Sequence, residues 1–325
     1  MKNAARRSVF QFVAGIACAS LWALDAPAQV YPAKPIRMLV GYPAGGGTDL
    51  IARIVARKLS ESLDQQVVVE NRPGASGSIA NERVALAPPD GYTLLMVSPS
   101  SLPQPAMRGK LTYDFQRDLA PVSLVVSGPY VLVVHTSVPA RNVNELIALA
   151  RAHRGKLNFG SSGLGSAGHL AGELFNTMAK VKLVHVPYKG GSESVVATVS
   201  GEVDMGFPSI ASVMAFLKSG RLRALAVLGA KRASFMPSLP TLDESGLRGY
   251  DRSTWYGMLA PAAVPKQIIS RLNAAVNETV NTPEMKALLL KDGLEPQAYA
   301  PEQFALFIQK EIAQDAALAE TVKGQ

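Results

Sequence analysis

The chain has 325 residues, of which 48% are hydrophobic and 18% charged, and its formal net charge is +8. This length and apolar content are sufficient for two globular domains of moderate size. A single cysteine, Cys18, excludes a disulfide framework and a thiolate metal site. The basic residues are scattered and no dense run of Lys and Arg is interleaved with aromatic residues, so the charge favours anionic ligands without indicating nucleic-acid binding.

The first 28 residues are predicted to be a secretory signal peptide. Basic residues begin the chain, residues 9–24 are mostly apolar, and Ala26-Pro-Ala28 is a small-x-small cleavage site. Gln11 and Ser20 interrupt the apolar run, which argues against a membrane anchor. Cleavage after Ala28 would leave 30 basic and 24 acidic residues, a net charge of +6, and no cysteine. We therefore expect a soluble protein that is exported to the periplasm and held together by its hydrophobic core.

A glycine-rich stretch over residues 41–49, Gly-Tyr-Pro-Ala-Gly-Gly-Gly-Thr-Asp, is expected to organise the fold. It follows an apolar strand over 36–40 and precedes a helix over 50–59 that has one apolar face. Thr48 or Asp49 is a suitable N-cap. The backbone N–H groups of such a turn lie at the positive end of a helix and suit a carboxylate, phosphate or sulfate. The alternative is a tight turn that binds nothing.

Strands and helices then alternate, which predicts parallel pairing and an α/β fold. We expect strands over 66–70 and 92–97 with a helix over 79–87 between them. Ser98 lies just past the carboxyl end of the second of these strands, where ligands commonly bind in open α/β sheets.

A restart of this alternation predicts a second domain. Apolar runs over 119–126 and 130–134 are joined at Ser127-Gly-Pro129, and a helix over 143–153 and a strand over 156–159 follow. Further strands are predicted over 182–186, 203–207, 222–228 and 255–260, and helices over 194–199, 210–217, 266–280, 283–290 and 301–322.

A second glycine-rich loop, over residues 160–168, again lies between a strand and a helix, here over 169–178. Its sequence is Gly-Ser-Ser-Gly-Leu-Gly-Ser-Ala-Gly, so its hydroxyls and glycines repeat the chemistry of the first loop. Two such loops in successive α/β units are what a clamp on one anion requires.

Several catalytic and cofactor motifs are present only in part. Residues 163–168 match G-x-G-x-x-G, but no acidic residue follows at 186–190 to hold a ribose. Neither glycine loop contains a P-loop Gly-Lys-Ser/Thr, and the serines of the second loop fail G-x-S-x-G. His169 and Glu173 lie one helical turn apart, but no third ligand has matching spacing. Neither catalysis, a metal nor a cofactor is therefore expected. Trp255 and Tyr256 either line a cleft or pack in the core or at a hinge.

Ordered motifs along the chain resemble the periplasmic solute receptors of tripartite tricarboxylate transporters, the Bug or TctC family. The resemblance extends from about Tyr31 to the C-terminus. It rests on Tyr31-Pro-Ala-Lys-Pro-Ile36, the Pro-Ala-Gly-Gly loop with Asp49, Glu70-Asn-Arg-Pro-Gly-Ala75, Pro89-Asp-Gly-Tyr92, Gly168-His-Leu-Ala-Gly-Glu173, Pro187-Tyr-Lys-Gly190 and Gly201-Glu-Val-Asp204.

The resemblance implies a two-domain, type II-like Venus flytrap that closes on its ligand about a hinge near 127–129 and 249–256. Domain 1 would comprise 29–127 plus 253–325, and domain 2 would be the inserted segment 128–252. A small carboxylate would be held mainly by main-chain amides, hydroxyls and water. By position, the ligand-binding residues would be Tyr42, Ala44, Gly45, Gly46, Thr48, Asp49, Ser161, Ser162, Gly165, Ser166, His169 and Asp204.

One segment departs from the family pattern. Where the family usually has a stretch rich in Gly, Thr, His and Asn, this chain has Ser98-Pro-Ser-Ser-Leu-Pro-Gln104, and we include Ser98 among the candidate ligand-binding residues. The leading hypothesis is a monomeric periplasmic receptor that passes a small carboxylate to a membrane permease. The alternatives are a secreted hydrolase that uses an unrecognised serine, and a receptor that signals through a membrane partner.

Overall fold

The computed structural model describes residues 31–103 and 111–323, of which Lys34 onward belong to one compact unit. The predicted signal peptide over 1–28 lies outside the described residues, and so does Gln104. No helix within the described ranges has the length and apolar character needed to cross a membrane.

The described residues form two β-sheets. The first has the strand order β11-β4-β10-β3-β1-β2 and the second β7-β6-β8-β5-β9. The strands of the first sheet are β1 (Ile36–Val40), β2 (Val67–Asn71), β3 (Thr93–Val97), β4 (Leu119–Pro129), β10 (Ser253–Pro261) and β11 (Glu295–Pro296). Those of the second are β5 (Val131–His135), β6 (Asn158–Ser161), β7 (Val184–Pro187), β8 (Met205–Gly206) and β9 (Leu222–Val227).

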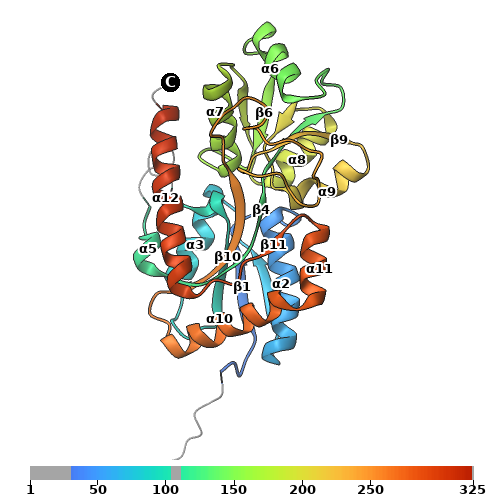
Figure 1. The fold of residues 1–325 in the computed structure, drawn as a ribbon. Coiled ribbons are helices and arrows are strands. Elements are labelled where there is room, and N and C mark those ends of the chain that lie inside the picture. Colours follow the sequence, from blue (N-terminus) through green and yellow to red (C-terminus); the bar gives the residue numbers. More distant parts are fainter. Residues whose placement is uncertain (1–30, 104–110, 324–325) are drawn as a thin grey trace, which may run out of the picture. The chain divides into compact units, whose positions relative to one another are not determined.

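Helices connect most of these strands (Figure 1). They are α2 (Gly47–Leu63), α3 (Ser78–Ala85), α5 (Phe115–Asp118), α6 (Val143–Ala152), α7 (Ala167–Ala179), α8 (Gly191–Ser200), α9 (Ile210–Lys218), α10 (Lys266–Asn281), α11 (Pro283–Lys291) and α12 (Pro301–Lys323). Two 3₁₀ turns, η1 (Ala75–Gly77) and η2 (Pro99–Ser101), lie in the loops after β2 and β3.

The expected parallel pairing holds for only part of each sheet. β1 pairs in parallel with β2 and β3, and β6 with β7 and β8. By contrast, β10 is antiparallel to β3 and β4, and β5 is antiparallel to β8 and β9. The first sheet is mixed because β10 returns to it after the chain has formed the second sheet, a long-range connection that strand patterns do not reveal. The second sheet is mixed because β5 runs antiparallel to its neighbours β8 and β9.

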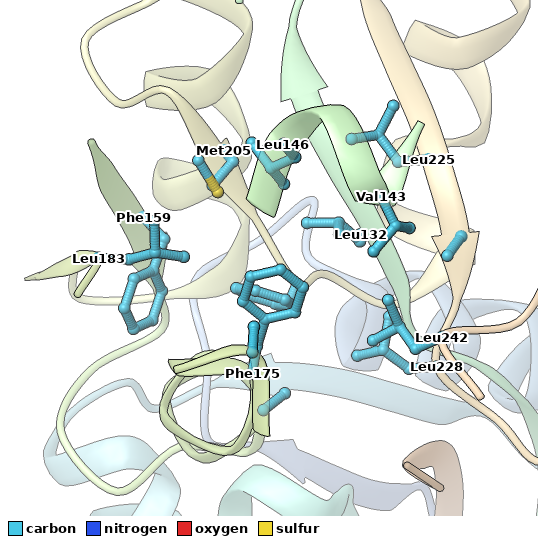
Figure 2. Close-up of a cluster of buried hydrophobic side chains, with 14 of the residues drawn as sticks. Leu132, Val143, Leu146, Phe159, Phe175, Leu183, Met205, Leu225, Leu228 and Leu242 are labelled. Atoms are coloured by element: carbon cyan, nitrogen blue, oxygen red, sulfur yellow. The ribbon is translucent and has the colours of Figure 1, made fainter. Parts of the chain in front are cut away.

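Alternating side chains of β5 divide the core of the second sheet. Leu132 and Val134 face a hydrophobic cluster with α6 and α7, whereas Val131 and Val133 face another with α8 and α9. Figure 2 shows the first cluster, in which Leu132 is joined by residues of α6, α7 and β6. Helices therefore cover both faces of this sheet, as expected for an α/β unit.

The first sheet also has two covered faces. Residues of β3 and β10 share a hydrophobic cluster with α3, α5 and α12, while α2 and α10 pack against each other and against β2 and β4 respectively. The long helix α12 contacts β4 and also reaches α7, which follows a strand of the second sheet (Figure 1).

Two stretches of chain carry the fold from one sheet to the other. β4 leads through Tyr130 into β5, and the chain returns through Arg252 into β10, where Ser253 pairs with Pro129. Arg252 lies within the predicted hinge segment 249–256, and Tyr130 directly follows the other predicted segment, 127–129. That the chain bends at these crossings stays a prediction. The division into a domain over 29–127 plus 253–325 and a domain over 128–252 stays a prediction.

Candidate functional site

A cavity of about 80 Å³ lies where the two sheets meet, beyond the carboxyl ends of β1, β3 and β6. One water molecule needs about 10–15 Å³ of such volume, so a small molecule or several waters would fill the cavity. The cavity is lined by Tyr42, Gly46, Gly47, Thr48, Ser98, Ser100, Tyr130, Gly160, Ser161, Ser162, Gly168, Gly191, Ser194, Phe207, Pro208, Ser209, Ser212, Thr254 and Tyr256.

The amino ends of four helices meet at this cavity. Gly47 begins α2, Gly168 is the second residue of α7, Gly191 begins α8, and Ser209 is the N-cap of α9. The first amides of a helix have no partner within the helix, and the helix dipole places partial positive charge there. No charged side chain is among the described residues that line the cavity, so these helix ends set its electrostatic character.

Three hydroxyl-bearing residues of the crossing segments, Tyr130, Thr254 and Tyr256, also line the cavity. Burial raises the pKa of Tyr130 and of Tyr256, so both phenols stay protonated and can donate hydrogen bonds. Gly47 lies so close to Tyr256 that a Cβ atom there would overlap the Tyr256 hydroxyl oxygen and would lie 2.7 Å from Ser209 Oγ. A side chain at the first position of α2 would therefore displace these two hydroxyls.

Asp49 holds the first glycine loop and does not line the cavity. Its carboxylate accepts hydrogen bonds from Gly45 N (2.9 Å), Arg53 Nε (3.0 Å) and Asn71 Nδ2 (2.8 Å). Burial raises the pKa of Asp49, but the bonds from these three residues outweigh it and leave the pKa below its usual value. The N-cap of α2 is Gly46, so the prediction of a Thr48 or Asp49 cap is wrong; both lie within the first turn.

Asp49→Asn is expected to lower stability by about 1.5–3 kcal/mol, the range for hydrogen bonds to a charged group. An asparagine amide would face one of the three donors with a donor of its own. The pKa of Asp49 is lower in the folded state than its usual value of 3.8. The carboxylate therefore contributes its full stabilisation above about pH 3.8, and this stabilisation is lost as the pH falls through the folded-state pKa. Urea unfolding of both proteins should show a difference at about pH 7 that shrinks in acid; a constant difference would contradict this role.

Two serine side chains accept hydrogen bonds from the amides at the start of α7, which follows the second glycine loop. The Ser166 side chain caps α7 by accepting from His169 N at 3.3 Å, and Ser166 is fully buried. The next amide, Ala167 N, donates to Ser100 Oγ at 3.1 Å, so a residue from the loop after β3 already occupies this helix end. Of the amides at the start of α7, that of Gly168 belongs to a residue that lines the cavity.

His169 packs behind the loop instead of facing the cavity. Its Nδ1 accepts from Gly165 N at 3.0 Å, and its ring stacks on His185 with centroids 3.9 Å apart. Burial is the main cause that lowers the pKa of His185 to about 3. His185 Nε2 lies 2.6 Å from Ser161 Oγ. Burial also raises the pKa of Glu173, whose Oε1 lies 3.8 Å from His169 Nε2.

The structure brings six of the thirteen candidate residues to the cavity, namely Tyr42, Gly46, Thr48, Ser98, Ser161 and Ser162. The other seven are not among its lining residues. Ala44 and Gly45 are exposed, Asp49, Gly165, Ser166 and His169 are buried behind the loops, and Asp204 is distant. Asp204 lies beside Asn158 at the amino end of β6, where its Oδ2 accepts from Asn158 N at 2.8 Å; the loops follow the carboxyl end.

The amino ends of α8 and α9 also lie at the cavity, and neither was predicted from the sequence to belong to the site. Gly190-Gly191-Ser192 forms a glycine turn between β7 and α8, like the two glycine loops that were identified from the sequence. Before α9, Pro208-Ser209 contains a suitable cap residue. Tyr256 lines the cavity, whereas Trp255 packs in the core against Phe304 and Phe307 of α12. The described residues contain no group of three or more His, Cys, Asp or Glu side chains placed to hold a metal ion.

Comparison with known proteins identifies the family. The model of the tripartite tricarboxylate transporter family receptor, TctC, matches residues 51–323. A relative from Pseudomonas sp. (strain P51), the UPF0065 protein in the tcbD-tcbE intergenic region, is 39% identical over 312 residues, which is 94% of this chain and 91% of the relative.

Solved structures agree with this result. R. palustris Rpa4515 with adipate has a TM-score of 0.86 and 34% identity, covering 90% of this chain and 98% of its own. MatC (Rpa3494) from Rhodopseudomonas palustris with bound malate has a TM-score of 0.84 and 30% identity, covering 89% and 100%. These similarities confirm the α/β periplasmic binding-protein fold, and the similar proteins are solute-binding receptors, not enzymes. The chain belongs to the TctC family of tripartite tricarboxylate transporter receptors, which are periplasmic solute-binding proteins.

Proposed function

We propose that this protein captures a small dicarboxylate in the cavity between its two sheets and delivers it to the membrane permease of a tripartite tricarboxylate transporter. The observation that carries the proposal is the meeting of four helix amino ends at a cavity with no charged side chain among its described lining residues. Such an arrangement offers main-chain N–H groups and hydroxyls to an anion from several directions.

The ligand class is supported by two similar proteins. Rpa4515 is described with adipate and MatC with malate, and both of these ligands are dicarboxylates. In this chain Tyr130 and Tyr256 supply neutral hydroxyl donors at the cavity, while Thr48 lies in the first turn of α2 and Ser98 follows β3. These donors come from different elements around the cavity, as a ligand with two carboxylates requires.

Binding is proposed to close two domains, 29–127 plus 253–325 and 128–252, about the crossings at Tyr130 and Arg252. Hinge closure around a ligand is a common movement of periplasmic binding proteins. Hydrogen bonds already connect loops of the two sheets, from Ala167 N to Ser100 Oγ and from Ser76 Oγ to the Leu164 carbonyl oxygen (3.5 Å). We take the receptor to act as a monomer after removal of residues 1–28 as a signal peptide.

A thermal-shift screen of the protein without residues 1–28 tests the ligand class. Adipate or malate at about a hundredfold excess over its Kd should stabilise the folded state by about 2.7 kcal/mol, which a melting curve resolves. The matched control is adipamide, which keeps the length of adipate and removes both charges. Thr48→Ala should weaken the response to the diacid, because it removes one hydroxyl from the cavity. If adipamide, amines or neutral sugars raised the Tm and no acid did, the proposal would fail.

A further inference from the structure

Ser161 is the residue of the second glycine loop with the most hydrogen-bond partners at the cavity. Its Oγ receives hydrogen bonds from Gly163 N (3.2 Å) and from Ser166 Oγ (3.2 Å). Two possible acceptors surround its own hydrogen, His185 Nε2 at 2.6 Å and the Gly163 carbonyl oxygen at 3.1 Å. Ser161 is 3% exposed, so these partners determine whether its hydroxyl donates or accepts a hydrogen bond.

The direction of these bonds follows from the neighbours. The Ser166 hydroxyl oxygen accepts from His169 N, which leaves its hydrogen for Ser161 Oγ. A hydroxyl oxygen has two lone pairs, and here two donors occupy them. The single hydrogen of Ser161 is then left to donate, and His185 Nε2 is the nearer of its two acceptors.

The surroundings of His185 fix it as that acceptor. The ring stacks on His169 (3.9 Å between centroids) and lies tilted against Phe159 (5.1 Å), where burial disfavours the charged imidazolium. His169 is neutral as well, since its Nδ1 accepts from Gly165 N and its hydrogen is therefore on Nε2. A neutral His185 that accepts at Nε2 carries its own hydrogen on Nδ1.

We propose that His185 is a positioning residue of the ligand site, which accepts the Ser161 hydroxyl hydrogen and thereby fixes the turn over 161–166 that presents the amino end of α7 to the ligand. This inference rests on the proposed function for its effect on affinity, but not for the hydrogen-bond direction itself. It also assigns Ser161 a structural part: a 2.6 Å Ser–His contact is typical of an activated nucleophile, but here the lone pairs needed for attack are both occupied.

Nuclear magnetic resonance of the unliganded wild-type protein tests the direction of the bond. His185 should show an unprotonated Nε2 and a protonated Nδ1 between about pH 5 and 8, and Ser161→Ala should move the Nε2 signal. A protonated Nε2 in this range would overturn the proposal. Because no ligand is present, this result stands even if neither adipate nor malate binds.

Variants test the positioning role. His185→Phe keeps the stacked ring and removes the acceptor, whereas His185→Gln returns an acceptor oxygen. We expect His185→Phe and Ser161→Ala each to weaken adipate or malate binding about tenfold, which corresponds to about 1.4 kcal/mol. The double variant should be no weaker than either single one, since both remove one interaction. His185→Gln should restore most of the affinity.

The amide signals of Gly163 and Gly165 report the same turn without any ligand. They should shift in His185→Phe and stay near their wild-type positions in His185→Gln. Wild-type amide signals in His185→Phe would overturn the proposal, and so would labelling of Ser161 by a serine-directed phosphonofluoridate. If wild-type protein bound neither dicarboxylate while these shifts appeared, the proposed ligand class would be wrong and the positioning role would hold.

Discussion

Gly190→Ala is expected to weaken ligand binding by about 5- to 150-fold while leaving the Tm of the unliganded protein near that of the wild type. Gly190 precedes α8 in the second half of the fold, and a Cβ atom there would lie 2.5 Å from Cδ and 3.0 Å from Cγ of Pro43. Pro43 belongs to the glycine loop after β1, and its ring cannot rotate away. The added methyl group would hold the two loops apart, at a cost of about 1–3 kcal/mol for an overpacked contact.

The backbone of Gly190 does not itself require glycine, because its φ of −169° is extended. The matched control is therefore the double variant Pro43→Ala/Gly190→Ala, which lacks the ring atoms that the new methyl group would meet. It should recover most of the lost affinity. Calorimetry with adipate or malate measures the affinities, and small-angle scattering should show compaction on binding in the wild type and less in Gly190→Ala. Wild-type affinity in the single variant would contradict closure at this contact.

The first glycine loop shows how far the sequence could predict the site. Glycines between an apolar strand and an amphipathic helix predict a turn with exposed amides, and Gly46 and Thr48 do line the cavity. The family resemblance implies a ligand-binding role for Asp49, yet its carboxylate reaches back to Gly45 and across to Asn71. Local patterns place a residue in a turn; which way its side chain points depends on partners far along the chain.

The cavity residues at the two crossings show what local patterns could not provide. Tyr130 and Tyr256 are brought together where the chain crosses between the sheets, and Ser100 caps α7 although 67 residues separate it from Ala167. Neither contact has a sequence signal, because both depend on how the sheets are placed. The start of α8 was predicted three residues late, at Ser194, because Gly191 was not included in the helix. Because of that error, the amino end of α8 was not predicted to be one of the four helix ends at the cavity.

The crossing at Arg252 is held by a buried ion pair to the C-terminal helix. Arg252 Nη2 lies 2.6 Å from Asp315 Oδ1 of α12, and the two side chains are 11% and 2% exposed. Beside them, Trp255 Nε1 donates to Glu311 Oε2 at 2.8 Å, and Arg252 N donates to the Leu228 carbonyl oxygen at 2.7 Å. The guanidinium already has one buried atom, Nε, without a hydrogen-bond partner among the described residues. The buried positive charge of Arg252 is therefore stabilised mainly by Asp315 of α12.

Asp315→Ala is therefore expected to lower the free energy of unfolding by about 3–5 kcal/mol, because it leaves the Arg252 guanidinium buried without its hydrogen-bonded counter-charge. The matched control, Arg252→Met/Asp315→Leu, removes both charges and should recover most of the stability, since apolar residues of similar volume often replace a buried pair without loss. Urea unfolding should show a lower midpoint for the single variant at an unchanged m-value. A loss below about 1 kcal/mol would mean that water screens the pair as it does at a surface, and that α12 does not hold the crossing through this contact.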